Sequence, residues 1–243
     1  MKKFVFGIFA LLLSVSFTFA QSDQLRTASR AYDNFALNND LGKLTEAVDA
    51  ITTAGNDAAT AETVEYNLAA GDIYGAVLNQ IMLSRQMADL GGPSMDDIPQ
   101  VDNPGALAAQ AYMMAHSKAD KRGKQRAAMR GLTALQGNLS NAGIYGLQDE
   151  TYEVSYANFS AALAVDEYLT NNGEVSSYAS AEGNQRGDET YYAGLSALLI
   201  EKYAEAKPFY MALKEMNYGE DGSIYDGLYR IAQAEGDMET AIA

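Results

Sequence analysis

Residues 139–162 read LSNAGIYGLQDETYEVSYANFSAA, and residues 190–213 read TYYAGLSALLIEKYAEAKPFYMAL. The two stretches share one register, with Gly143, Tyr152, Ser155, Phe159 and Ala162 in the first and Gly194, Tyr203, Ala206, Tyr210 and Leu213 in the second. A small residue lets two helices approach closely, and small and aromatic residues three or four positions apart share one face of the returning helix. The stretches therefore predict two copies of an antiparallel helical hairpin.

The same register recurs toward both ends of the chain. Its members are Phe35, Leu44, Ala47, Ile51 and Ala54 near the N-terminus and Tyr229, Met238 and Ala241 near the C-terminus. A further unit begins at Gly71, which lies 36 residues after Phe35, and its second helix is predicted over residues 105–119. Repetition at this length is typical of an α-solenoid.

Composition also favours an all-α protein, because the chain has only 4 prolines and no run of alternating polarity. We expect an α-solenoid of about five antiparallel helix hairpins, the last one truncated. The predicted hairpins cover residues 23–55, 62–120 with a loop at 91–105, 124–170, 188–217 and 222–243. Because the last hairpin is incomplete, we expect the natural protein to continue past Ala243.

One segment interrupts the array between the two best-matched hairpins. Gly143 and Gly194 are 51 residues apart, which is longer than one repeat. The Ser-, Gly- and Asn-rich residues 174–188 account for the excess and predict a surface loop or a short helix. Residues 62–90 are predicted to form one long helix, stopped by Gly91-Gly92-Pro93.

Residues 1–20 have the pattern of a secretory signal peptide. Lys2 and Lys3 precede an apolar run, and Thr18-Phe19-Ala20 forms a small-x-small cleavage site. We expect residues 21–243 to form the mature repeat domain, without a transmembrane anchor after cleavage. A secreted chain without cysteine is typical of a Gram-negative envelope, so the predicted location is the periplasm or the outer membrane and its exterior.

The charge of the chain is strongly negative, at −15 for the full sequence. Without Lys2 and Lys3, 15 basic residues remain against 32 acidic ones, a net charge of −17. Such a surface repels phosphate backbones and makes nucleic acid an unfavourable partner. It is explained either by solubility or by a basic partner.

One basic run stands out against this balance. It extends from Lys118 to Arg130 and contains a single acid, Asp120. Two interpretations remain open: a solvated helix, or a contact for an acidic partner or for lipid headgroups.

Several segments resemble tetratricopeptide repeats (TPR), whose turn commonly reads Gly-Asp-Tyr-x-x-Ala. They are Gly194 to Leu213, Gly236-Asp237-Met238-Glu239-Thr240-Ala241, Asn141 to Ala162, Gly42 to Ala47 and Ala70-Gly71-Asp72-Ile73-Tyr74. The resemblance covers nearly the whole mature chain and implies a scaffold for protein–protein interaction without chemistry of its own. The chain departs from the family pattern where the early aromatic residue is often missing, where the closing proline is absent, and at two insertions.

No catalytic motif is visible in the sequence. There is no cysteine, the sole histidine is His116, and no Gly-x-Ser-x-Gly, Walker or dinucleotide-binding loop occurs. Asp96, Asp97 and Asp102 lack the spacing of a calcium loop. The acidic pairs Asp149/Glu150 and Asp188/Glu189 precede predicted helices, where they would favourably face the helix dipole. We therefore expect no catalytic residue, no metal site and no cofactor.

A ligand would bind the face formed by the first helices of the hairpins. Residues three before, one after and four after each glycine make one stripe. The candidate binding residues are Leu68, Asp72, Ser140, Ile144, Leu147, Tyr191, Leu195 and Leu198. Their mostly apolar character fits either packing between repeats or a groove for a protein or peptide partner.

The expected function is that of a non-enzymatic protein–protein interaction scaffold in an envelope complex. Two alternatives stay open. The array could be the helper or targeting region of a longer protein with a separate effector domain, or it could bind glycans at the cell surface through its 16 tyrosines.

Overall fold

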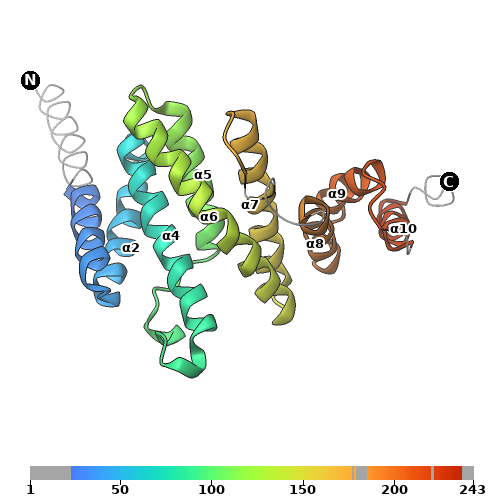
Figure 1. Ribbon diagram of the computed structural model, residues 1–243, viewed down its shortest axis with the longest axis horizontal. Helices are drawn as coiled ribbons and strands as arrows, with labels where there is room; N and C mark the ends of the chain where they lie inside the picture. The colour runs from blue at the N-terminus through green and yellow to red at the C-terminus, as the bar shows by residue number, and fades with distance from the viewer. Residues whose placement is uncertain (1–22, 177, 179–184, 220–221, 237–243) are drawn as a thin grey trace, which may run out of the picture. The chain divides into compact units, whose positions relative to one another are not determined.

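The structure is a computed structural model that describes residues 23–176, 178, 185–219 and 222–236. The predicted leader, residues 1–20, and the predicted end of the last hairpin, residues 237–243, lie outside the described residues. Within the described part the chain is all-helical and has no strand, and helices pack against their neighbours in sequence order (Figure 1).

The helices follow one another with short connections. A first helix covers residues 23–38. It is followed by α2 (Leu41–Gly55), α3 (Ala58–Ala61), α4 (Val64–Gln86), η1 (Ala88–Leu90), η2 (Met95–Asp97), α5 (Pro104–Lys118), α6 (Arg122–Gln148), α7 (Tyr152–Asn171), α8 (Gln185–Leu199), α9 (Tyr203–Glu215) and α10 (Ser223–Glu235). The chain divides into two compact units, residues 1–131 and residues 132–243, with the division inside α6. Each unit is described by itself.

Polar residues begin the helices of the first unit where the sequence predicts breaks. The Asp40 carboxylate accepts a hydrogen bond from the Gly42 N–H at 2.9 Å, and Asn39 turns the chain with φ of 55°. The Thr63 hydroxyl accepts from the Tyr66 N–H and starts α4. Pro104 occupies the first turn of α5, where its missing N–H costs nothing.

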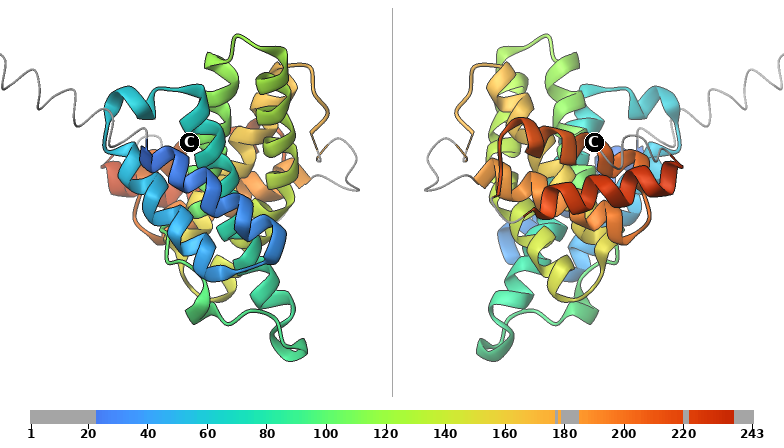
Figure 2. Two further views of the ribbon diagram at one scale, coloured as in Figure 1. Left: turned by 90° about the vertical axis from the view of Figure 1, so that its left-hand side faces the viewer. Right: turned by 90° about the vertical axis from the view of Figure 1, so that its right-hand side faces the viewer.

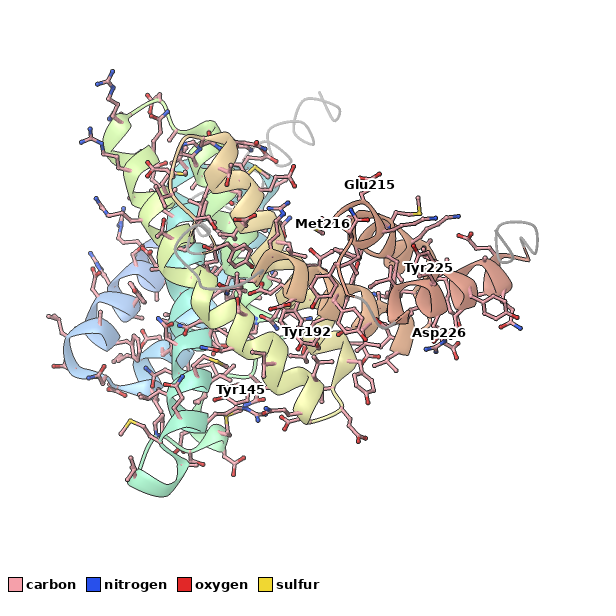
Figure 3. All side chains as sticks on the ribbon, turned by 45° about the vertical axis from the view of Figure 1, so that its right-hand side comes forward. Tyr145, Tyr192, Glu215, Met216, Tyr225 and Asp226 are labelled. Atoms are coloured by element: carbon pink, nitrogen blue, oxygen red, sulfur yellow. The ribbon has the colours of Figure 1, made fainter. Side chains whose placement is uncertain are left out.

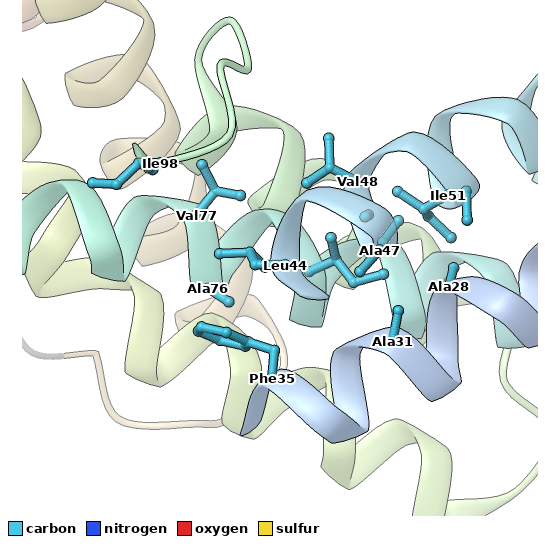
Figure 4. Close-up of a cluster of buried hydrophobic side chains, with 14 residues drawn as sticks. Ala28, Ala31, Phe35, Leu44, Ala47, Val48, Ile51, Ala76, Val77 and Ile98 are labelled. Carbon is cyan, nitrogen blue, oxygen red and sulfur yellow. The ribbon is translucent and has the colours of Figure 1, made fainter. Parts of the chain in front are cut away.

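The core of the first unit is formed by helix 23–38, α2 and α4 (Figure 4). Alanines line the contact: Ala28 and Ala31 on the first helix meet Ala47 on α2 in one cluster, beside Phe35 and Ile51. Small side chains bring the helix backbones close, so the larger residues between them are fully covered. The left view of Figure 2 shows helix 23–38 beside α2.

A tyrosine ring between two glycines joins three helices of this unit. The Tyr112 ring, on α5, fills the space where Gly71 of α4 and Gly131 of α6 have no side chain, and a Cβ added at Gly71 would lie 2.6 Å from the ring. The Tyr112 hydroxyl donates to the Asp72 carboxylate at 2.7 Å, which fixes the ring. The glycines are therefore required by packing and not by backbone conformation.

The second unit uses the same contact. Phe159 of α7 lies against Gly143 of α6, with 2.8 Å from the ring to a Cβ added at that glycine. The Tyr210 ring of α9 lies between Gly194 of α8 and Gly227 of α10. Tyr210 is 2% exposed, and burying such a side chain contributes about 1.5–3 kcal/mol. The predicted contact of Gly143 and Gly194 with their returning helices is confirmed. The right view of Figure 2 shows α9 and α10.

Three predicted boundaries differ from the structure. The helix predicted over 62–90 ends at Gln86, because the chain enters a 3₁₀ turn at Met87 and then a left-handed conformation at Gly91. The predicted loop 91–105 contains η2 and is anchored by Ile98, which is buried in the core of the first unit. Helix α8 begins at Gln185, inside the segment predicted as an interruption, whose residues 177 and 179–184 lie outside the described part.

Candidate interaction surface

The predicted binding residues of the first unit lie on α4. Leu68 is half-buried. Asp72 keeps access to solvent while it accepts the hydrogen bond from Tyr112. Partial burial raises the pKa of Asp72, and the Tyr112 hydroxyl opposes this by stabilising the carboxylate. Burial and the neighbouring Asp72 charge raise the pKa of Tyr112, so its phenol stays protonated and remains a donor. Asp72 therefore has a structural role, the attachment of α5 to α4.

The residues predicted on α6 differ in exposure. Ile144 is 41% exposed and Leu147 is half-buried, so both offer apolar surface. Ser140 is buried, and its hydroxyl donates to the Glu189 carboxylate of α8 at 2.5 Å. Ser140 therefore contributes to the packing of α6 against α8 and offers no surface to a ligand.

The residues predicted on α8 are partly covered by other tyrosines. The Tyr191 ring stacks on Tyr218, with 6.0 Å between ring centroids, and the Tyr218 hydroxyl donates to Asp188 at 2.6 Å. Leu195 is half-buried, and Leu198 is 2% exposed inside the core of the second unit. Leu198 packs there with residues of α9 and α10, because the segment after α9 folds back over the start of α8.

A buried polar cluster surrounds Glu189, and sequence reasoning missed it. Glu189 is 4% exposed and accepts hydrogen bonds from Ser140, from the Tyr178 hydroxyl and from the Gln185 amide. Burial and the Glu189 charge raise the pKa of Tyr178, which keeps this phenol a donor. The sequence predicted Glu189 as a helix-dipole residue. Its position after Gln185, four residues earlier on the same helix face, was the available signal of an internal polar contact.

The other acidic pair predicted at a helix start lies in a tight turn. Asp149 and Glu150 follow the last residue of α6, and Glu150 has φ of 58°. Asp188 is in the first turn of α8, where a negative charge is favourable, as predicted.

Exposed aromatic and sulfur-containing side chains lie on α8 and α10 and after α9 (Figure 3). We call Tyr192, Met216 and Tyr225 the α8–α10 set; their exposed fractions are 36%, 38% and 64%. Lys214 lies over the Tyr225 ring at 5.8 Å from its centroid, and Tyr229 is exposed one turn further along α10. The tyrosines therefore divide into buried rings that join helices, such as Tyr112 and Tyr210, and exposed rings that are available to a partner.

The described residues hold no group of three or more potential metal ligands among His, Asp and Glu. Asp96, Asp97 and Asp102 are exposed in the connection between α4 and α5. His116 lies in the last turn of α5. No described helix is long and apolar enough to cross a membrane. Comparisons of the chain with protein-family models, with curated proteins and with solved structures returned no match.

Proposed function

We propose that this chain is a non-enzymatic scaffold for protein–protein contacts, built as a solenoid of TPR-like hairpins and exported to the envelope of a Gram-negative bacterium. The observation that carries the proposal is the repeated contact of an aromatic ring with two glycines, at Tyr112 in the first unit and at Tyr210 in the second. A packing solution that recurs in this way is expected of a repeat protein, in which each helix pair contacts its neighbours and leaves outer faces for partners.

The side chains of the α8–α10 set supply the chemistry for such a partner. Tyrosine and methionine are enriched in protein–protein interfaces, because both bury a large apolar area and tolerate irregular contacts. The exposed side chains of Ile144 and Leu199 add apolar area in the same unit. The proposed partner is a protein or peptide that presents an apolar face to this unit.

A site-specific photo-crosslinking experiment tests the scaffold. A photoreactive residue replaces Tyr225 or Met216 in the protein expressed in an exporting Gram-negative host, and the matched control places it at Thr52, an exposed position of α2. We expect discrete, light-dependent protein adducts from positions 216 and 225 and none from position 52. Absence of any protein adduct from all three positions would contradict a scaffold.

The export part of the proposal rests on the leader pattern of residues 1–20. Intact-mass measurement of the protein from the envelope fraction is expected to give a chain that begins at Gln21. A chain that keeps Met1 and stays in the cytoplasmic fraction would refute export and would leave the crosslinking result untouched.

A further inference from the structure

Helix α6 lacks acidic residues altogether. Its 27 residues contain no Asp or Glu, in a chain that has 32 acidic residues against 17 basic ones. Its N-terminal part, in the first unit, carries Arg122, Lys124, Arg126 and Arg130. This distribution concentrates positive charge at one place on a strongly negative protein.

Three of these side chains form a line along the helix. Arg122, Arg126 and Arg130 are four residues apart, so they lie on the same face in successive turns. All three are exposed. We call them the arginine stripe.

The arginine stripe is unpaired, in contrast to the lysines beside it. Lys118 pairs with Glu62, and Lys124 pairs with Glu65, whose pKa is lowered chiefly by that hydrogen bond. In the described part of the first unit, no hydrogen bond or ion pair involves a side chain of the stripe. The two lysines therefore have a structural role in joining α4 to α5 and α6, and the three arginines do not.

The position of the stripe is also unfavourable for the helix itself. Positive charges near a helix N-terminus oppose the helix dipole, and the first turn of α6 has no acidic residue to offset them. Folding and solubility thus give no reason for three arginines here, since an acidic or neutral residue would serve both better. Local choices that work against stability are expected where a residue is needed for binding.

We infer that Arg122, Arg126 and Arg130 form a docking stripe for an acidic, helical segment of a partner protein. The inference rests on the proposed scaffold function and names the chemistry of one partner. Guanidinium groups bind carboxylates through two parallel hydrogen bonds, and a lysine does not reproduce that geometry. Carboxylates four residues apart on a partner helix repeat at the spacing of the arginines.

Charge argues for a protein segment over an anionic membrane. A membrane is an extended surface and would bring much of the acidic surface of a −15 chain close to its own negative charge. A single helix contacts only the stripe, and salt screens the more distant acids beyond about 8–10 Å. No large apolar side chain is exposed between Arg122 and Arg130 that could insert into lipid.

The test uses the purified mature protein and a fluorescein-labelled helical peptide of alanine and glutamine with glutamate at every fourth position. Fluorescence anisotropy at low salt is expected to show binding that weakens as salt is added. The same peptide with glutamine in place of glutamate is expected not to bind. Equal binding of the two peptides would overturn the inference.

Variants locate the binding. The triple substitution Arg122→Gln, Arg126→Gln and Arg130→Gln is expected to weaken binding at least tenfold. The control Arg26→Gln, Arg30→Gln and Arg230→Gln changes the net charge equally at other exposed positions and is expected to stay within twofold. Circular dichroism checks that both variants are folded. A triple lysine variant keeps the charge and is expected to fall between wild type and the glutamine variant.

Two results would count against the assignment and not against the scaffold. The first is an equal loss of affinity in both glutamine variants. The second is binding to vesicles with 30% phosphatidylglycerol in the absence of peptide binding, which would identify a lipid surface as the ligand. The crosslinking experiment at Tyr225 and Met216 is independent of both.

Discussion

At the scale of single residues, the tyrosine between two glycines limits what the sequence tolerates. The Tyr112 ring cannot retreat from Gly71, because its hydroxyl is held by Asp72 and its other face meets Gly131. Alanine normally stabilises a helix relative to glycine by about 1 kcal/mol. Here the added methyl group would overlap the ring, and overpacking costs about 1–3 kcal/mol, so the clash outweighs the helix propensity.

We therefore predict that Gly71→Ala lowers the free energy of unfolding by about 1–2 kcal/mol, measured by urea denaturation. The matched control is Gly137→Ala, because a Cβ at that helical glycine meets nothing within 4 Å. The control is expected to stabilise by about 0.5–1 kcal/mol. A neutral or stabilising effect of Gly71→Ala would show that the ring is free to move.

Tyr210 makes stability depend on alkaline pH. Burial raises the pKa of Tyr210 to about 12 from the ordinary value of 10.0. The folded state then binds the phenolic proton more tightly than the unfolded state, so this stabilisation is complete below pH 10 and is lost as pH rises toward 12. A shift of two pKa units corresponds to about 2–3 kcal/mol.

The prediction is a decline in the free energy of unfolding between pH 9 and pH 11.5 that is shallower in Tyr210→Phe. Phenylalanine keeps the ring between Gly194 and Gly227 and removes the titrating group. Tyr225→Phe, which removes an exposed hydroxyl, is the control and should retain the wild-type decline. Urea denaturation at several pH values measures it, and an unchanged slope in Tyr210→Phe would contradict the assignment.

At the scale of helices, α9 contains an unfavourable residue. Pro208 lies in the helix interior, where it cannot donate a hydrogen bond to the carbonyl four residues earlier and its ring crowds that carbonyl. Pro208 is exposed, so its side chain contributes little burial in return.

We predict that Pro208→Ala raises the free energy of unfolding by about 1–3 kcal/mol, measured by urea denaturation. Met211→Ala, also at an exposed position of α9, is the control and should change it by less than about 0.5 kcal/mol. A destabilising Pro208→Ala would show that the bend at this proline is needed for the packing of α9.

The sequence predicts helix pairing better than it predicts the candidate surface. The glycines at 143 and 194 encode their contacts locally, because the aromatic residue of the returning helix lies at a constant distance along the chain. The burial of Ser140 depends on Glu189, 49 residues later, and the partial covering of Tyr191 depends on Tyr218. Neither partner has a fixed spacing, so periodicity places these residues on a helix face without showing what covers that face.

At the scale of the whole molecule, net charge opposes folding. The chain has a charge of −15, and bringing like charges together in the compact state costs free energy that salt screens. Most ion pairs in the described residues are exposed, including those of Lys43, Lys118 and Lys124, and exposed pairs contribute about 0–1 kcal/mol each. Screening the repulsion should therefore outweigh screening the pairs.

We predict that raising NaCl from 20 to 500 mM increases the melting temperature by about 2–5 °C, measured by circular dichroism or calorimetry. The matched variant Asp96→Asn and Asp97→Asn removes two exposed acids and leaves a net charge of −13 for the full chain. Its melting temperature at low salt should be higher and its gain on adding salt smaller. A melting temperature that falls with salt in the wild type would mean that attractive pairs dominate, and the negative charge would then need an explanation other than solubility.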